Sequence, residues 1–197
     1  MLNQSLQPSE IIVIDDGSTD DTGLMLRKDF PQIKTLYQTN QGVSSARNKG
    51  IHASTGDWVA LLDSDDEWLP DKLAQQISAL KNQSHYKICH TEEIWIRNEV
   101  RVNLNKQYQK KGGWIFNDCL PLCAISPSTV LIHRSIFEEV GLFKYRTMIK
   151  CVVNIRIMLM PYEIDIKEIL KRFFSEWPRF YFRQINITYG KCCQSLK

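Results

Sequence analysis

Two short apolar runs that each end in acidic residues are the feature that most constrains this chain. The run Glu10–Asp15 is followed by Asp16, and the run Trp58–Asp63 is followed closely by Asp65 and Asp66. Consecutive aliphatic and β-branched residues without alternation are typical of a strand that is buried on both faces of a sheet. The sequence therefore predicts two interior strands with carboxylates directly after them.

Helical segments separate the predicted strands. Residues 20–29 and 42–53 have helix-compatible spacing, Lys34–Tyr37 between them is a further strand candidate, and Pro70 opens a third helix. The apolar face of this third helix is expected to carry three residues: Leu73, Ile77 and Leu80. Strands that alternate with helices predict βαβ units, an α/β fold class and a mostly parallel sheet.

Shorter elements are expected in the next part of the chain. Strands are predicted over residues 86–91, 93–102 and 128–133, with a polar loop over 103–113 and a short helix from Ser135 to Gly141.

Charge divides the chain near Phe143. The 197 residues carry a net charge of only +3, which points to no nucleic-acid partner. Residues 1–143 hold 14 Lys/Arg and 18 Asp/Glu, whereas residues 144–197 hold 11 Lys/Arg and 4 Asp/Glu. We therefore expect a domain over 1–143 and a basic tail over 144–197 whose structure the sequence does not define.

Two further patterns bear on the cellular compartment. The six cysteines form no Cys-x-x-Cys pair, and the histidines do not fall at zinc-ligand spacing, which favours reduced cysteines. Met1 leads into polar residues rather than a signal peptide, and the apolar stretch Ile149–Tyr162 is too short to cross a bilayer. We expect a cytoplasmic protein.

The acid clusters predict a ligand site. In α/β sheets the ligand lies at the carboxyl ends of the strands, so Asp15-Asp16 and Asp63-Ser-Asp65-Asp66 should meet there. Crowded carboxylates repel one another unless a positive charge lies between them. A divalent cation that carries a diphosphate meets this need, and Arg47 on the intervening helix would contact the phosphates.

Four ordered motifs carry a family resemblance: Val13-Ile-Asp-Asp-Gly-Ser-Thr-Asp20, Asn40-x-Gly-x-x-x-Ala-Arg-Asn-x-Gly50, Leu61-Leu-Asp-Ser-Asp-Asp66, and Ser128-Thr-Val-Leu-Ile-His-Arg134 with Gly141-Leu-Phe143. In order and spacing they resemble the inverting family 2 glycosyltransferases. The resemblance covers about residues 2–143 and implies an incomplete GT-A (Rossmann-like) nucleotide-binding sheet with an acceptor-side region. It implies transfer of a sugar from a nucleotide-sugar, with a UDP-sugar favoured, to a glycan or lipid-linked acceptor of the cell surface.

The resemblance also implies roles for individual residues. Asp15, Asp16, Arg47, Asp63 and Asp65 would bind the nucleotide-sugar, with Asp16 at the base and Asp65 near the ribose. Asp65 and Asp66 would hold Mg²⁺ or Mn²⁺, with Asp66 as the main ligand.

Each of these residues also has a plainer interpretation. Asp15 or Asp16 could be a turn residue before Gly17, and Asp65 and Asp66 could cap the helix after Pro70. Arg47 could be a solvated helix residue. Six aromatic residues are expected to be structural or, for the tryptophans, part of an acceptor wall: Trp58, Trp68, Trp95, His52, His90 and His133.

Three alternatives compete with a transferase. Residues 59–65 resemble the nucleophile motif of haloacid-dehalogenase-like phosphatases, but the downstream lysine and acid pair of that family are missing. A calcium loop from Asp63 would place Trp68 and Ala74 where glycine and glutamate are required. An inactive fragment with weak nucleotide binding is the third, because residues 1–7 resemble only the end of the family's first helix.

The segment after Phe143 departs from the family. The resemblance places the catalytic base there, but Lys144–Tyr162 contains no acid, so the base is unknown and we expect little activity. Its basic composition suggests translation out of the ancestral frame. An apolar helical face within residues 166–177 would also allow peripheral contact with the inner face of a membrane.

Overall fold

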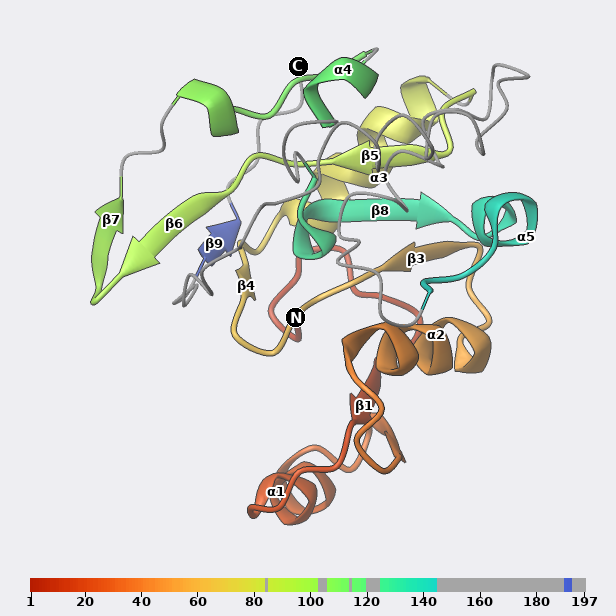
Figure 1. Ribbon diagram of the computed structural model, residues 1–197, viewed down its shortest axis with the longest axis vertical. Helices are drawn as coiled ribbons and strands as arrows, with labels where there is room; N and C mark the ends of the chain where they lie inside the picture. Colours follow the sequence, from red (N-terminus) through yellow and green to blue (C-terminus); the bar gives the residue numbers. More distant parts are fainter. Residues whose placement is uncertain (84, 103–105, 114, 120–124, 145–189, 193–197) are drawn as a thin grey trace, which may run out of the picture.

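The computed structural model describes residues 1–83, 85–102, 106–113, 115–119, 125–144 and 190–192. Within these ranges the chain forms three small sheets and the helices that pack on them (Figure 1). The α/β class predicted from the sequence is confirmed. The basic tail, with its expected membrane contact and change of frame, falls almost entirely outside the described residues.

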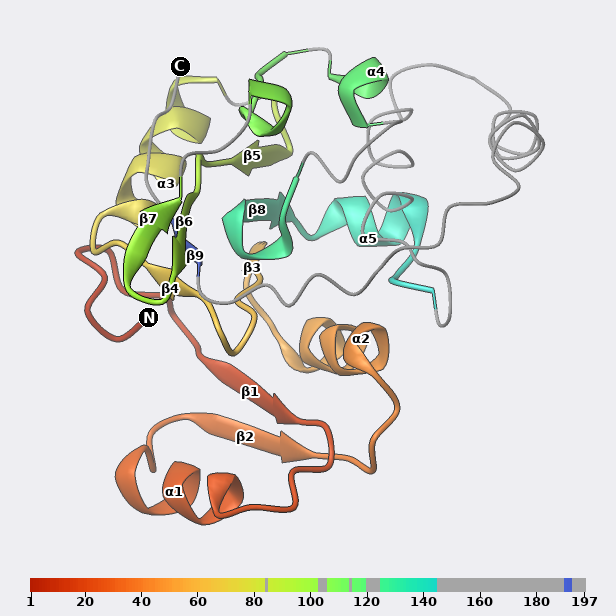
Figure 2. The same ribbon diagram turned by 60° about the vertical axis from the view of Figure 1, so that its left-hand side comes forward.

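The first unit is a parallel strand pair joined through a helix. β1 (Ile12–Asp15) is followed by α1 (Thr22–Asp29) and β2 (Lys34–Tyr37). The strands pair in register, so that Asp15 lies opposite Tyr37 and their carboxyl ends meet. Figure 2 shows the two strands side by side at one end of the molecule, with α1 beyond β2.

The second unit connects this pair to the centre of the molecule. α2 (Val43–Ala53) packs on β1, because a Cβ added at Gly50 would come 3.5 Å from the Ile14 side chain. β3 (Trp58–Ala60) follows and ends three residues earlier than the predicted strand, so Leu61, Leu62 and Asp63 belong to a loop.

The central sheet is antiparallel rather than mostly parallel. β8 (Val130–His133) lies between β3 and β5 (Ile88–His90) and runs antiparallel to both. Because β3 and β5 therefore point the same way, their carboxyl ends lie at one edge, beside the 3₁₀ turn η2 (Pro127–Thr129) that leads into β8. Among the described strands, the β1–β2 and β4–β9 pairs are the parallel ones.

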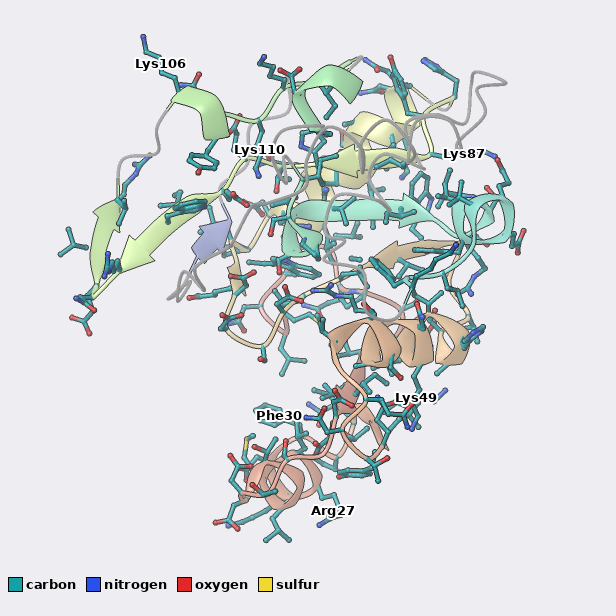
Figure 3. The ribbon with its side chains drawn as sticks, in the orientation of Figure 1. Arg27, Phe30, Lys49, Lys87, Lys106 and Lys110 are labelled. Carbon is teal, nitrogen blue, oxygen red and sulfur yellow. The ribbon has the colours of Figure 1, made fainter. Side chains whose placement is uncertain are left out.

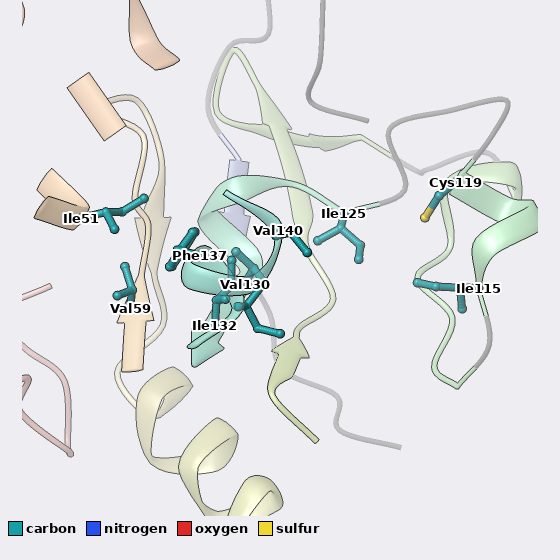
Figure 4. Close-up of a cluster of buried hydrophobic side chains, with 10 residues drawn as sticks. Ile51, Val59, Ile115, Cys119, Ile125, Val130, Ile132, Phe137 and Val140 are labelled. Carbon is teal, nitrogen blue, oxygen red and sulfur yellow. The ribbon is translucent and has the colours of Figure 1, made fainter. Parts of the chain in front are cut away.

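The main hydrophobic core lies between α2, the central sheet and α5 (Ser135–Val140). Figure 4 shows Ile51 of α2 next to Val59 of β3, with Val130, Ile132 and Phe137 beside them. Ile115 and Cys119, at the short helix α4 (Phe116–Cys119), complete the cluster with three further residues: Ile125, Ile136 and Val140.

A third sheet begins directly after the loop of residues 61–66, which carries Asp63, Asp65 and Asp66 and is called the acid-bearing loop below. It has the order β4 (Glu67–Trp68), β9 (Gly190–Cys192), β6 (Ile94–Arg97) and β7 (Val100–Val102). The predicted single strand over 93–102 is wrong. Asn98 and Glu99 have positive φ angles of 49° and 63°, which makes a tight turn between two strands. A 3₁₀ turn, η1 (Lys106–Tyr108), interrupts the predicted loop that follows.

Helix α3 (Lys72–Asn82) buries a partly polar face. Its buried residues are Lys72, Leu73, Gln76 and Leu80, whereas the predicted Ile77 is only half-buried. The backbone N–H of Leu73 donates to the side chain of Gln4, which in turn donates to the Leu69 carbonyl. Gln4 therefore satisfies one N–H of the first turn of α3, and Asp65, which makes no hydrogen bond to a described residue, does not cap this helix.

Two negative observations hold for the described part of the chain. None of the helices there has the length and apolar content that a bilayer crossing demands. The two described cysteine side chains, those of Cys89 and Cys119, are both free thiols.

Arg134 forms hydrogen bonds to the end of α2 and to the segment that leads into β3. Its guanidinium donates to the carbonyl oxygens of Gly56 (2.9 Å), Ser54 (2.8 Å) and Ile51 (3.3 Å) and to the Ser54 hydroxyl. The carbonyls at the end of a helix have no partner within the helix, so this guanidinium takes over their hydrogen bonds.

We expect Arg134→Met to lower the free energy of unfolding by about 2–3 kcal/mol, because part-buried carbonyls lose a charged donor. Urea denaturation measures this loss. Arg97→Met, at an exposed strand end, is the matched control and should change the unfolding midpoint little. Equal effects of the two substitutions would contradict the structural role of Arg134.

Candidate functional site

The candidate site lies where the carboxyl ends of β1, β2 and β3 open toward the start of α2. Asp15 ends β1, residues 38–42 connect β2 to α2, and the acid-bearing loop 61–66 follows β3. All five predicted acids lie at the carboxyl ends of β1 and β3 or in the loops that follow these strands. Arg47 lies on α2, which faces the same edge. Figure 1 shows α2 between the β1–β2 pair and β3.

Asp15 and Asp16 have distinct structural roles. Asp15 is buried at 8% exposure, and its carboxylate accepts from the Ser18 N–H at 2.7 Å, which makes it the turn residue. Asp16 accepts from the backbone N–H groups of Gln41 and Gly42, both at 2.8 Å, and from the Gln38 side chain. These hydrogen bonds, that from Gln38 first, hold the pKa of Asp16 below its usual range.

Gly17 is required by the close approach of these two loops. Its φ is +87°, and a Cβ there would come within 2.9 Å of the Asn40 backbone nitrogen. A side chain at this position would push the 38–42 loop away from Asp16.

Arg47 and Asp63 form the central ion pair of the site. Nη2 of Arg47 lies 2.6 Å from a carboxylate oxygen of Asp63, and the Arg47 side chain is only 10% exposed. The plainer interpretation of Arg47 as a solvated helix residue is therefore wrong. Its Nε is buried and has no hydrogen-bond partner among the described residues, so one donor of this cation is not satisfied there.

The acid-bearing loop is anchored at its base and exposed at its tip. The Asp63 N–H donates to the Ser128 hydroxyl at 3.0 Å, and the Asp66 N–H donates to the Asp63 carbonyl at 3.1 Å. Asp65 is exposed, and Asp66 is half-buried. The carboxylate of Asp65 has no hydrogen bond or ion pair with any described residue, so it faces water.

The Phe143 ring packs against the Arg47 guanidinium. The Asn48 side chain makes two hydrogen bonds to the Phe143 backbone, accepting from its N–H at 2.9 Å and donating to its carbonyl at 2.6 Å. The Phe143 ring centroid is 5.6 Å from the Arg47 guanidinium carbon, within the range of a cation–π contact. The Asn40–Gly50 motif and the Gly141–Phe143 motif therefore meet in space at the ion pair.

Asn48→Ala should lower the free energy of unfolding by about 1–2 kcal/mol, since two hydrogen bonds to Phe143 are lost. Asn48→Asp should be at least as harmful, because its carboxylate would face the Phe143 carbonyl without a donor between them. Chemical denaturation reports both losses. The control is Asn82→Ala at the exposed end of α3. An Asn48→Asp variant with an unchanged free energy of unfolding would contradict a structural role for the two hydrogen bonds between Asn48 and the Phe143 backbone.

The oxygen donors at this edge fit a hard divalent cation, with one restriction. In the described ranges, no group of three or more His, Cys, Asp or Glu side chains could hold a metal ion. Mg²⁺ uses one or two protein carboxylates and completes its shell with waters and phosphate oxygens. Asp65 and Asp66 can supply such a pair, but the remaining ligands must come from a bound diphosphate and water.

A second polar cluster, which the sequence did not indicate, lies beyond β5. Lys110 and Glu93 form an ion pair at 3.0 Å with side chains 6% and 13% exposed, and Trp95 Nε1 donates to the same Glu93 oxygen. Figure 3 shows Lys110 beside the ends of β5 and β6. Burial of the ring and the charge of Lys110 lower the pKa of His90 below its ordinary value, so the imidazole is neutral near pH 7.

This lowered pKa makes the stability depend on pH. Below about pH 6.5 the unfolded chain binds a proton at His90 that the folded chain does not, so the free energy of unfolding should fall as the pH falls. Above that pH both states are neutral and His90 contributes no slope. Urea midpoints at pH 7.5 and 5.5 should differ less for His90→Gln than for the unchanged protein. Equal differences would show that His90 titrates normally.

Several residues at the base of the acid-bearing loop had no signal in the sequence. Ser128 accepts from Asp63, and its carbonyl accepts from Trp68 Nε1 at 2.7 Å. Lys72, which is fully buried, lies with its ammonium 4.3 Å from the centroid of the Trp68 ring. The resemblance included Ser128, but neither pattern nor spacing could assign the contacts of Lys72 or Trp68.

One cavity lies away from these acids. It has a volume of about 270 Å³ and is lined by residues at the end of α2 and on α5: Ile51, His52, Arg134, Phe137, Glu138 and Leu142. The Arg134 guanidinium already donates hydrogen bonds to backbone carbonyls there, so we assign no ligand to this cavity.

The chain matches the family model described as "Glycosyl transferase family 2" over residues 1–141. An uncharacterized glycosyltransferase of Rickettsia bellii is 32% identical over 141 residues, which cover 71% of this chain and 20% of that protein. A Bacillus subtilis protein named as a teichuronic acid biosynthesis glycosyltransferase, TuaG, is 40% identical over 151 residues, covering 75% of this chain and 59% of that protein. The chain thus spans only part of the length of these relatives.

Solved structures show the same fold. The crystal structure of Staphylococcus aureus TarS residues 1–349 in complex with UDP-GlcNAc aligns with a TM-score of 0.60 at 16% sequence identity. The alignment covers 80% of this chain and 47% of that one. At this identity the likeness concerns the fold.

Proposed function

The chain belongs to glycosyl transferase family 2, and from that premise we propose that it binds a nucleotide-sugar, with a UDP-sugar favoured, together with Mg²⁺ or Mn²⁺. The proposed site is the edge formed by loops 15–18, 38–42 and 61–66. The TarS structure holds UDP-GlcNAc in the same fold, which supports a uridine nucleotide as the first ligand to test.

The Arg47–Asp63 pair carries this proposal. A buried guanidinium whose Nε has no partner among the described residues lies beside a loop that presents the exposed carboxylate of Asp65. A cation and a set of carboxylates in one place can hold the two parts of a metal–diphosphate complex, because Arg47 attracts the phosphates and the acids attract the metal. Neither a capping function nor a solvated surface would bury Arg47 in this way.

Individual roles follow from these positions. Arg47 would donate Nε–H to a diphosphate oxygen while its Nη2 keeps Asp63 in place. Asp65 and Asp66 would hold the metal, which supplies positive charge to the departing diphosphate. Asp15 and Asp16 would shape the nucleoside side of the site, since their carboxylates set the 15–18 turn and the 38–42 loop.

The proposed reaction is a direct, inverting displacement at the anomeric carbon of the sugar. An acceptor hydroxyl oxygen forms the new bond to that carbon, the bond from carbon to the diphosphate oxygen breaks, and the hydroxyl proton passes to a base. We assign no residue as this base, because the segment after Phe143, where the resemblance places it, lies outside the described residues beyond Lys144.

The acceptor is proposed as a growing surface polysaccharide or a lipid-linked glycan. The name of the Bacillus subtilis relative connects that protein to a cell-envelope polysaccharide, which supports this class of acceptor. Action on the inner face of the membrane, from the cytoplasm, fits a lipid-linked acceptor. Family membership leaves no support for the phosphatase alternative.

Calorimetry with UDP and Mn²⁺ tests the donor site. We expect UDP to bind with Mn²⁺ present and at least tenfold more weakly without it. We also expect Mn²⁺ alone to bind weakly, because the described residues offer no group of three ligands. Asp66→Asn should weaken the joint binding at least tenfold, and Arg47→Met should weaken it without abolishing the effect of Mn²⁺.

The matched control is Asp71→Asn, which removes an exposed carboxylate five residues away that makes no capping hydrogen bond. It should bind as the unchanged protein does. A folded protein that binds UDP equally with and without Mn²⁺, or an Asp66→Asn variant with full affinity, would refute the metal assignment.

A further inference from the structure

Lys72 is a charged group that the proposed chemistry does not use. Its side chain is fully buried on α3, in the interior of the described structure. The ammonium donates to the Gln76 side-chain oxygen at 2.6 Å and lies 4.3 Å from the centroid of the Trp68 ring. Burial of an ammonium removes its hydration, so the contacts with the Gln76 amide oxygen and the Trp68 ring help to compensate the buried charge.

A continuous set of contacts leads from Lys72 to the acid-bearing loop. The Trp68 ring, held against the ammonium, donates through Nε1 to the Ser128 carbonyl at 2.7 Å. The hydroxyl of the same Ser128 accepts the Asp63 N–H at 3.0 Å. Asp63 then pairs with Arg47, and its carbonyl accepts the Asp66 N–H.

Gln76 fixes the other side of Lys72. Its side-chain nitrogen donates to the carbonyls of Thr129, the last residue of η2, at 3.0 Å and of Cys89, in β5, at 3.2 Å. Lys72 and Gln76 therefore tie α3 to η2, where Ser128 lies, and to the neighbouring strands. Gln76 thus holds Thr129, the neighbour of Ser128, and Trp68 holds the Ser128 carbonyl itself.

We propose that Lys72 is a positioning residue for the donor site, acting through Trp68 and Ser128 to hold residues 63–66 in the conformation that presents Asp65 and Asp66. The predicted effect of Lys72 on ligand binding rests on the proposed function. The predicted effect on the conformation of the loop does not, because it concerns contacts within the chain alone.

A selective effect on the loop separates positioning from simple support of the fold. Removal of a buried ammonium leaves its polar partners unsatisfied, so Lys72→Met should lower the unfolding midpoint as well as release Trp68. Residues 63–66 should then sample more conformations.

Hydrogen exchange followed by NMR measures this release directly. In Lys72→Met the amides of Asp63 and Asp66, whose hydrogen bonds define the loop, should exchange about tenfold faster than in the unchanged protein. Leu80→Ala, a buried change on the same helix, should lower the unfolding midpoint without this selective effect on the two amides. Unchanged exchange at both amides in a folded Lys72→Met variant overturns the proposal.

A second variant keeps the test decisive if Lys72→Met does not fold. Trp68→Phe retains an aromatic ring beside Lys72 but removes the Nε1 donor to Ser128, so it should also speed exchange at Asp63 and Asp66. Slow exchange in this variant counts equally against the proposal.

Calorimetry with UDP and Mn²⁺ on the same variants separates the two hypotheses. Weakened joint binding in Lys72→Met, by fivefold or more, with unchanged binding in Leu80→Ala, supports both. Faster exchange in Lys72→Met together with no binding by the unchanged protein supports positioning and refutes the donor site. Full affinity in a Lys72→Met variant whose loop exchanges faster refutes the functional role of Lys72.

Discussion

The Arg47–Asp63 ion pair is the contact on which the rest of the site depends. It joins α2, which packs on the β1–β2 pair, to the loop after β3, a strand of the central sheet. The next residue of α2, Asn48, holds the backbone of Phe143, whose ring lies against Arg47. The pair is thus enclosed by protein on several sides, and its low exposure strengthens the attraction between the charges.

This enclosure explains why the motifs of the sequence occur together. Arg47 requires a carboxylate because an unpaired buried guanidinium is costly, and Asp63 supplies it. Asp63 in turn requires a fixed backbone, which Ser128 supplies from the turn before β8. Gly17 allows the 15–18 turn to approach Asn40 at the start of the same helix. Each motif supplies a partner that another motif needs.

The sequence predicted the elements better than their assembly. Apolar runs located β1, β2 and β3, and Ser135–Gly141 located α5, because periodicity and turn residues are local properties. The antiparallel placement of β8 depends on contacts between distant segments, which no local pattern contains. The positive φ angles at Asn98 and Glu99 escaped notice because the turn lacks glycine.

The site shows the same division. The acids and Arg47 were recognisable in the sequence by residue type and order, whereas the separate structural role of each one was not. Asp15 and Asp16 differ only by one position, yet one is buried in a turn and the other holds a neighbouring loop. Lys72 and Gln76 are buried on α3 but were not among the residues expected on its buried face, because a lysine in a helix is usually solvated. Burial of polar groups follows from partners elsewhere in the chain, such as Trp68 and Thr129.

The distribution of charge at this edge bears on how the proposed metal would bind. The Ser18 N–H meets Asp15, three donors meet Asp16, and Arg47 meets Asp63. Asp65 is exposed to water and Asp66 is half-buried, and the described residues form no group of three metal ligands. Mg²⁺ and Mn²⁺ bind such open sites weakly unless another ligand completes the shell. A diphosphate would complete it, and Arg47 lies beside the same loop through its pair with Asp63. Under the proposed function the affinity for metal and the affinity for nucleotide are therefore one coupled quantity, since each ligand supplies the charge that the other lacks.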